Sequence, residues 1–137
     1  MSLVQWMYAS SCAESSDVVF NSILESSRRN NKNSGITGIL FFSDGHFLQV
    51  LEGETQDVLK TYGRIAQDPR HSNIVLLLQH EIERRDFDGW TMGWRTILPT
   101  DLKGFPQYAQ YFTVFPDGIN INARPGIALE MLEAFSQ

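Results

Sequence analysis

The feature that most constrains the fold is a pair of short apolar segments, residues 36–43 and 47–52, with Asp44 and Gly45 between them. Asp-Gly between two apolar segments favours a two-residue turn, because both turn positions require a left-handed backbone that these residue types tolerate. The sequence therefore predicts a β-hairpin in the first half of the chain, with each apolar segment forming one strand.

Amphipathic and apolar segments alternate regularly on both sides of this hairpin. Two segments repeat apolar residues at helical spacing, and three more are strand-sized and apolar. The resulting order, βαββαββ, is typical of a ferredoxin-like α+β fold, in which two helices cover one face of a mixed sheet. The first helix starts near residue 17 and is expected to end at Asn30 or Asn31. The second helix is predicted for residues 55–67, and the other strands for residues 3–9, 73–82 and 90–97.

A different pattern begins at residue 98, where prolines become frequent and the apolar periodicity loosens. A short amphipathic helix is predicted for residues 126–135. We therefore divide the chain into a domain, residues 1–97, and a C-terminal extension, residues 98–137. The extension either packs on the sheet or provides contacts to another copy of the chain or to a partner protein. The apolar residues that suit either role are Phe105, Tyr108, Tyr111, Phe112 and Phe115.

The composition of the 137 residues argues against several classes of protein. Sixteen acidic and eleven basic side chains give a net charge of −5, which disfavours a nucleic-acid-binding surface. The single cysteine, Cys12, excludes internal disulfides, and the three histidines match no metal-ligand spacing. The sequence shows no secretory signal and no apolar run long enough to span a membrane. A cytoplasmic protein that binds neither nucleic acid nor membranes is therefore expected.

Two polar residues stand within apolar strands. Gln49 lies between Phe47 and Leu51 on one strand face. It is either a satisfied polar core residue or an edge residue, because a buried amide must find hydrogen-bond partners. Tyr8 is either a core tyrosine with a satisfied hydroxyl group, or a hydrogen-bond or one-electron donor to an excited cofactor.

Two further pairs of residues each allow a structural and a functional interpretation. Asn30 and Asn31 either cap the first helix or present carboxamides to the polar edge of a planar heterocycle. Trp90 and Met92 share one face of the last predicted strand, where core packing is the simpler interpretation.

Charged residues gather around the end of the second predicted helix. Arg64 and Asp68 are spaced as an i,i+4 ion pair, and Arg70 and His71 follow directly. An exposed ion pair contributes little to stability, so the four residues have no necessary structural role. Together they are suited to meet the polar edge or the phosphates of a ligand.

These segments together resemble the BLUF family of blue-light sensors that use FAD. The resemblance covers residues 3–97, which is the whole predicted βαββαββ unit. GITG followed by FLQVLEGE is its most specific part, and the matching segments occur in the order expected for the family. The resemblance is carried by LVQWMYASS, ILESSRRNNKNSGITGIL, HFLQVLEGE, RIAQDPRH and FDGWTMGW.

The resemblance implies a non-covalently bound FAD between the two helices, with FMN or riboflavin as alternatives in the same site. It also implies that light drives transfer of an electron and a proton from Tyr8 to the flavin. Their return leaves the hydrogen bonds of Gln49 rearranged and the flavin absorption shifted to the red. Trp90 and Met92 match the signalling positions of the family, and Trp6 is a candidate competing electron donor beside Tyr8. The implied flavin-binding residues are Tyr8, Ile23, Asn30, Asn31, Phe47, Gln49, Arg64, Asp68, Arg70 and His71.

The resemblance further implies a photosensor and not an enzyme. The 40 residues after the predicted domain are too few for a cyclase or phosphodiesterase module. Output is therefore expected through a homo-oligomer or through a separate response-regulator-like protein or signalling enzyme. Two alternatives are a cofactor-free interaction or small-ligand domain and an acylphosphatase-like hydrolase. The hydrolase would need an arginine in an anion-binding loop, and residues 9–16 contain none.

Overall fold

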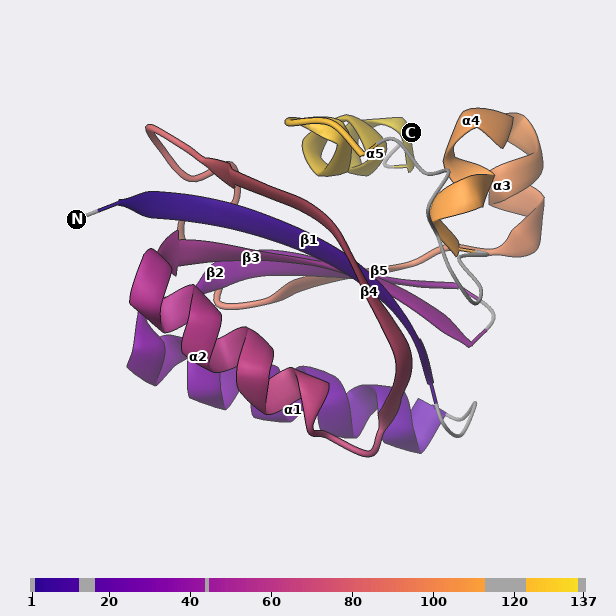
Figure 1. Ribbon diagram of the computed structural model, residues 1–137. Helices are drawn as coiled ribbons and strands as arrows, with labels where there is room; N and C mark the ends of the chain where they lie inside the picture. Colours follow the sequence, from indigo (N-terminus) through magenta and orange to yellow (C-terminus); the bar gives the residue numbers. More distant parts are fainter. Residues whose placement is uncertain (1, 13–16, 44, 113–122, 136–137) are drawn as a thin grey trace.

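The computed structural model describes residues 2–12, 17–43, 45–112 and 123–135, so Asp44 and Phe115 lie outside the described residues. Its centre is a five-stranded sheet. The strands are β1 (Leu3–Cys12), β2 (Thr37–Ser43), β3 (His46–Glu54), β4 (His71–Glu81) and β5 (Gly93–Thr96). They lie in the order β4-β1-β3-β2-β5 (Figure 1). The β2–β5 pair is parallel and the other three pairs are antiparallel.

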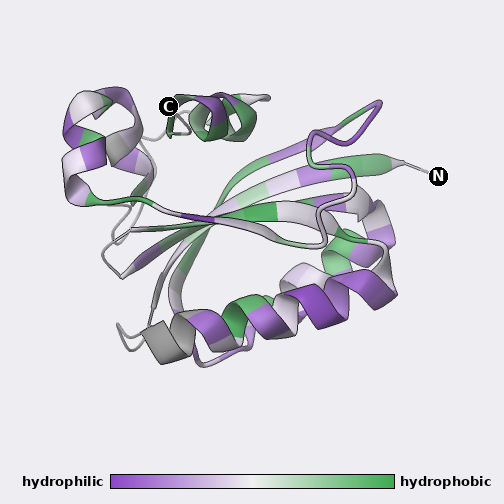
Figure 2. Cartoon of the chain, turned by 180° about the vertical axis from the view of Figure 1, so that it is seen from behind, coloured by the Kyte–Doolittle hydropathy of each residue, from purple (hydrophilic) through white to green (hydrophobic). Residues whose placement is uncertain are grey.

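Two helices, α1 (Asp17–Ser34) and α2 (Thr55–Ala66), cover one face of the sheet (Figure 1). The predicted ferredoxin-like α+β architecture is confirmed, with β5 added beside β2. Hydrophilic residues dominate α1, the helix nearer the viewer in Figure 2. The predicted end of this helix at Asn30 or Asn31 is wrong, because helical geometry continues to Ser34. The helix stops before Gly35, whose φ of +67° suits a glycine that follows a helix end.

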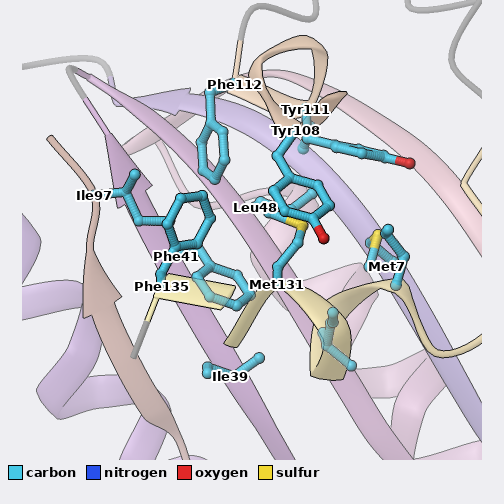
Figure 3. Close-up of a cluster of buried hydrophobic side chains, with 14 of the residues drawn as sticks. Met7, Ile39, Phe41, Leu48, Ile97, Tyr108, Tyr111, Phe112, Met131 and Phe135 are labelled. Atoms are coloured by element: carbon cyan, nitrogen blue, oxygen red, sulfur yellow. The ribbon is translucent and has the colours of Figure 1, made fainter. Parts of the chain in front are cut away.

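The C-terminal extension covers the opposite face of the sheet (Figure 1). It comprises α3 (Pro99–Gly104), α4 (Pro106–Ala109), the 3₁₀ turn η1 (Gln110–Phe112) and α5 (Ile127–Phe135). Figure 3 shows the rings of Tyr108 and Phe112 beside Phe41, and all three belong to one buried apolar cluster. We call this the extension-side cluster. None of the helices in the described ranges combines the length and the apolar character needed to cross a membrane.

The last strand is shorter than predicted, because the residues just before Gly93 form turn and loop hydrogen bonds that are not part of the sheet. Residues 86–89 form turns, and the backbone N–H of Trp90 donates to the carbonyl oxygen of Phe87 over 3.0 Å. The Trp90 carbonyl in turn accepts from the N–H of Gly38 on β2 over 3.0 Å. Trp90 and Met92 therefore precede β5, and the prediction that they share a strand face is wrong.

Candidate functional site

A cavity of about 350 Å³ lies between α1 and α2. Small-molecule sites typically measure about 300–1,000 Å³, so this volume suits part of a large ligand better than all of it. The wall combines apolar, hydroxyl, carboxamide, carboxylate and guanidinium groups. It contains seven of the predicted flavin-binding residues: Ile23, Asn30, Asn31, Arg64, Asp68, Arg70 and His71. The remaining wall residues are Ser26, Ser27, Arg29, Thr61, Ile65 and Gln67.

The other three predicted flavin-binding residues lie on the strands and do not line the cavity. Tyr8 and Phe47 belong to the buried cluster between the sheet and the two helices, which also contains Ile23 and Ile65 of the cavity wall. Gln49 lies on the same face of β3 as Phe47, because strand residues two apart point the same way. The structure therefore places these side chains in the layer that adjoins the cavity.

Gln49 is a buried amide with one satisfied and one unsatisfied end. Only 1% of the residue is exposed, and β3 lies between β1 and β2, so the edge interpretation is wrong. Its Nε2 donates to the sulfur of Met92 over 3.5 Å. Its Oε1 has no hydrogen-bond partner among the described residues. Gln49 is therefore a core residue, and its amide is satisfied at one end among the described residues.

Tyr8 faces Gln49 directly across the β1–β3 pair. Cβ atoms of directly opposed residues in an antiparallel pair lie about 5 Å apart, so the two side chains are immediate neighbours. The ring of Tyr8 is fully buried, and its hydroxyl group has no hydrogen-bond partner among the described residues. Burial raises the pKa of this phenol well above its ordinary value of 10.0, and nearby Tyr62 and Asp68 raise it further. Tyr8 is therefore a neutral phenol at physiological pH.

Sequence reasoning missed the position of Tyr62 beside Tyr8. The ring of Tyr62 on α2 makes edge contacts with Tyr8 and with Trp6, each with ring centroids 5.4 Å apart. The helical periodicity places Tyr62 on the inner face of α2, but periodicity does not specify which strand residues it meets. Tyr62 thus joins the two aromatic residues of β1.

Asn31 connects α1 to the segment before β5. Its side chain is buried, and its Nδ2 donates to the Thr91 carbonyl over 2.6 Å. Asn30 is half-buried in the cavity wall. Both residues lie inside the helix, so the capping interpretation does not hold for either of them. Both residues line the cavity.

His71 is held neutral at the start of β4. Burial lowers the pKa of its imidazole from 6.5 to about 4, although Asp68 acts in the opposite direction. Its Nδ1 lies 2.9 Å from the hydroxyl oxygen of Ser10, which is buried on β1. The imidazole ring also contacts Phe47, with ring centroids 5.2 Å apart. Strand alternation places Ser10 on the same face as Tyr8. This alternation is the sequence signal that could have identified Ser10, which was not among the predicted site residues.

Asp68 is paired with Arg70, so the predicted pairing with Arg64 is wrong. Arg70 Nε lies 3.0 Å from Asp68 Oδ1, and Arg70 Nη2 lies 2.5 Å from Asp68 Oδ2. This pair lowers the pKa of the Asp68 carboxyl group. Because α2 ends at Ala66, Asp68 is no longer on the helix face that carries Arg64. Arg64 is exposed at the cavity wall.

Arg70 also binds α1 across the cavity. Its Nη1 donates to the Ser22 hydroxyl over 2.7 Å, and its Nη2 donates to the Ser26 hydroxyl over 3.1 Å. The spacing of these serines, i and i+4 on a predicted helix, was a signal for a shared polar face. It did not indicate the partner, which is 44 residues further along the chain.

Met92 and Trp90 lie in different environments. Met92 is 2% exposed and belongs to the buried cluster on the helix-covered face, beside Gln49. Trp90 is 43% exposed, and its ring contacts Phe87 with centroids 6.0 Å apart. Phe87 belongs to the extension-side cluster. The sequence left open which residue points inward, and in this structure it is Met92.

The residues present fit a flavin. An isoalloxazine ring has apolar faces and an edge of donors and acceptors, and this cavity offers apolar walls with carboxamides and a charged pair. In the adjoining layer, Tyr8 Oη and Gln49 Oε1 are buried without partners among the described residues. The third such atom, Glu54 Oε2, lies at the β3–α2 junction, away from the cavity. Unpaired buried polar atoms are uncommon in native proteins, so the first two are suited to a ligand's polar atoms.

The fold and the cavity define a ferredoxin-like domain that binds a planar cofactor between two helices. The family model described as "Sensors of blue-light using FAD" matches residues 3–93. The chain therefore belongs to the BLUF family, and it is a blue-light sensor domain that uses FAD.

Comparison with known proteins supports this assignment. The chain is 54% identical over 50 residues to the blue light- and temperature-regulated antirepressor BluF of Escherichia coli (strain K12), covering 36% of this chain and 12% of that protein. It is 34% identical over 73 residues to a photoactivated adenylate cyclase subunit beta of Euglena longa, covering 53% of this chain and 8% of that protein. The solved dark-state structure of the BLUF protein BlrB superposes with a TM-score of 0.74 at 28% identity, covering 99% of this chain and 98% of that one.

Proposed function

We propose that Tyr8 and Gln49 form the light-responsive pair of this sensor, and that light rearranges the hydrogen bonds of Gln49. One observation carries the proposal. The two side chains are buried neighbours on β1 and β3, and each has a polar atom without a partner among the described residues. This pair is therefore suited to respond to a change in a bound ligand.

The bound FAD supplies absorption of blue light and, when excited, an acceptor for an electron and a proton. Tyr8 keeps its phenolic proton in the dark, because burial raises the pKa of the hydroxyl group. It can therefore release an electron and a proton together.

Gln49 suits a switch because its amide has a donor end and an acceptor end. Rotation of the amide exchanges one for the other at a fixed position. In the observed orientation Nε2 faces the sulfur of Met92. A thioether is a weak acceptor, so the amide loses little when it leaves this contact.

We assign FAD binding to the cavity wall and to the layer beneath it. The carboxamides of Asn30 and Asn31 suit the ring's polar edge, and Ile23 and Phe47 suit its apolar faces. Arg64 at the exposed wall suits a phosphate. The full set that we propose is Tyr8, Ile23, Asn30, Asn31, Phe47, Gln49, Arg64, Asp68, Arg70 and His71, with Trp90 and Met92 relaying the change.

We further propose that this chain passes its signal to another protein and does not itself catalyse a reaction. Segments similar to this chain occur in an antirepressor and in a cyclase subunit, as their names state. The same sensor can therefore serve different outputs, and a response-regulator-like protein or a signalling enzyme would fit as the partner. A homo-oligomer is the expected resting form. Measuring the mass in solution in darkness and under blue light tests whether the assembly changes.

The light response is tested on the purified protein with Gln49→Leu. We expect the wild type to be yellow, to shift its flavin absorption to the red under blue light, and to recover in darkness. Gln49→Leu should bind FAD but show no red shift, because leucine has no amide to rearrange. Gln79→Leu, at an exposed position on β4, is the matched control and should respond normally. A full red shift in Gln49→Leu would refute the assigned role. A colourless wild type that cannot take up FAD would favour a cofactor-free domain.

A further inference from the structure

One carboxylate is completely buried on the face of the sheet opposite the candidate flavin site. Glu52 is 0% exposed and follows Gln49 by three residues on β3. Strand side chains alternate, so the two residues point to opposite faces. Burial of a charged group is unfavourable unless hydrogen bonds replace its hydration, so the partners of Glu52 indicate what it does.

Glu52 joins three strands to the connection between β4 and β5. Its Oε2 accepts from Gln5 Nε2 on β1 and from the backbone N–H of Asp86, both over 2.8 Å. Its Oε1 accepts from the Thr37 hydroxyl on β2 and from the backbone N–H of Phe87, both over 3.0 Å. Both carboxylate oxygens are thus satisfied, and two of the four bonds fix backbone at one point of the connection.

This fixed point lies next to Trp90. The N–H of Trp90 bonds to the carbonyl of Phe87, and the two rings are in contact. The Trp90 ring also covers Gly93. A Cβ atom added to Gly93 would lie only 2.2 Å from Trp90 Cε3, so this ring position requires glycine. Contact with Phe87 and the space left by Gly93 together define this position of the indole.

Met92, two residues after Trp90, is held on the other face. Its carbonyl accepts from Arg28 Nε over 3.1 Å, and the preceding Thr91 carbonyl accepts from Asn31. Its sulfur accepts from Gln49 Nε2. Because only Thr91 separates the two residues, we expect a backbone shift at Trp90 to move Met92 as well.

We propose that Glu52 is a positioning residue for the light-sensing site. It fixes the backbone at Asp86 and Phe87, which keeps Trp90 on Gly93 and Met92 beside Gln49. The inference rests on the function proposed above, since it gives the Met92–Gln49 contact a part in the response.

The test replaces Glu52 by Gln in the FAD-bound protein. A glutamine amide nitrogen cannot accept hydrogen bonds, so two of the four donors lose their acceptor. The chain has four methionines, Met1, Met7, Met92 and Met131, so a spectrum of ¹³C-methyl-labelled methionine is simple to assign. In darkness we expect the Met92 signal to shift or split, and the Met131 signal to stay in place. Recovery after illumination should be at least about threefold faster, because a loosened neighbour lowers the barrier to rotation of Gln49.

Two further variants make the test decisive. Glu81→Gln, at an exposed position on β4, removes the same charge and should leave both measurements unchanged. Gly93→Ala keeps every Glu52 hydrogen-bond partner but excludes the Trp90 ring, so it should also move the Met92 signal. An unchanged Met92 signal or an unchanged recovery rate in folded Glu52→Gln would overturn the proposal. If Glu52→Gln does not fold, an unchanged Met92 signal in Gly93→Ala would overturn it. The dark spectrum requires no photochemistry, so a wild type without a red shift would defeat the proposed function and not this result.

Discussion

Buried polar groups on the two faces of the sheet differ in their hydrogen-bond partners. On the extension-covered face, both carboxylate oxygens of Glu52 have partners. On the helix-covered face, Gln49 Oε1 and Tyr8 Oη have none among the described residues. Glu52 and Gln49 are only three residues apart on one strand, so the difference comes from the partners within reach on each face, which for Glu52 lie on β1, β2 and the β4–β5 connection. The protein itself supplies hydrogen-bond partners for the buried carboxylate on one face, whereas the two polar atoms on the other face are suited to a cofactor.

The largest expected effect tests how much the extension-side cluster contributes to stability. Phe112 is 2% exposed in the extension-side cluster. Phe112→Ala should lower the free energy of unfolding by about 3–5 kcal/mol, because it removes a buried ring and leaves a cavity. Where the variant is folded, its red shift should match that of the wild type. Urea unfolding and a light-minus-dark spectrum measure the two quantities. A reduced red shift in folded protein would show that the packing of the extension also affects the light response.

The elements that follow from local pattern were predictable, and those that depend on distant contacts were not. Alternation and helical spacing predicted the sheet, both covering helices and α5, because each signal lies within one segment. The start of β5 was not predictable, because residues 87–92 bond to partners far away in the sequence, including Glu52, Asn31 and Arg28. Arg70 likewise binds Ser22 and Ser26 of α1. The resemblance supplied the candidate residues, but their hydrogen bonds are known only from the structure.

The next effect concerns His71, a titratable group on the helix-covered face. Its pKa is about 4 in the folded protein and 6.5 when unperturbed. As the pH falls below 6.5, the unfolded chain binds a proton before the folded protein does. The contribution of His71 to the free energy of unfolding is therefore fully present above pH 6.5, and it is lost progressively as the pH falls towards 4. The loss attributable to His71 should approach about 3 kcal/mol.

Unfolding by urea at several pH values between 7.5 and 4.5 measures this loss. The difference between the wild type and His71→Gln isolates the contribution of His71, because Asp68 and the other carboxylates titrate in both proteins. Equal pH dependence in the wild type and His71→Gln would show that His71 is not held neutral.

A smaller effect is expected at Arg70, which connects the two sides of the cavity. Arg70→Lys keeps the charge but loses the planar group that binds Asp68 through two nitrogens while reaching Ser22 and Ser26. We expect a loss of about 1 kcal/mol in unfolding free energy, the usual net contribution of a hydrogen bond at a partly exposed site. FAD should also dissociate faster. Arg64→Lys is the control for stability, and an equal loss there would contradict a special role for Arg70.

The smallest expected effect concerns Trp6, which contacts Tyr62 on the helix-covered face, and it tests whether Trp6 is a second electron donor there. Trp6 and Tyr8 each contact Tyr62, with ring centroids 5.4 Å apart in both pairs. If Trp6 competes with Tyr8 as an electron donor, Trp6→Phe should lengthen the decay of the excited flavin slightly, and far less than Tyr8→Phe. Transient absorption measures both decays. Trp94→Phe, at a half-exposed position on β5, is the matched control. An unchanged decay in Trp6→Phe would exclude Trp6 as a donor.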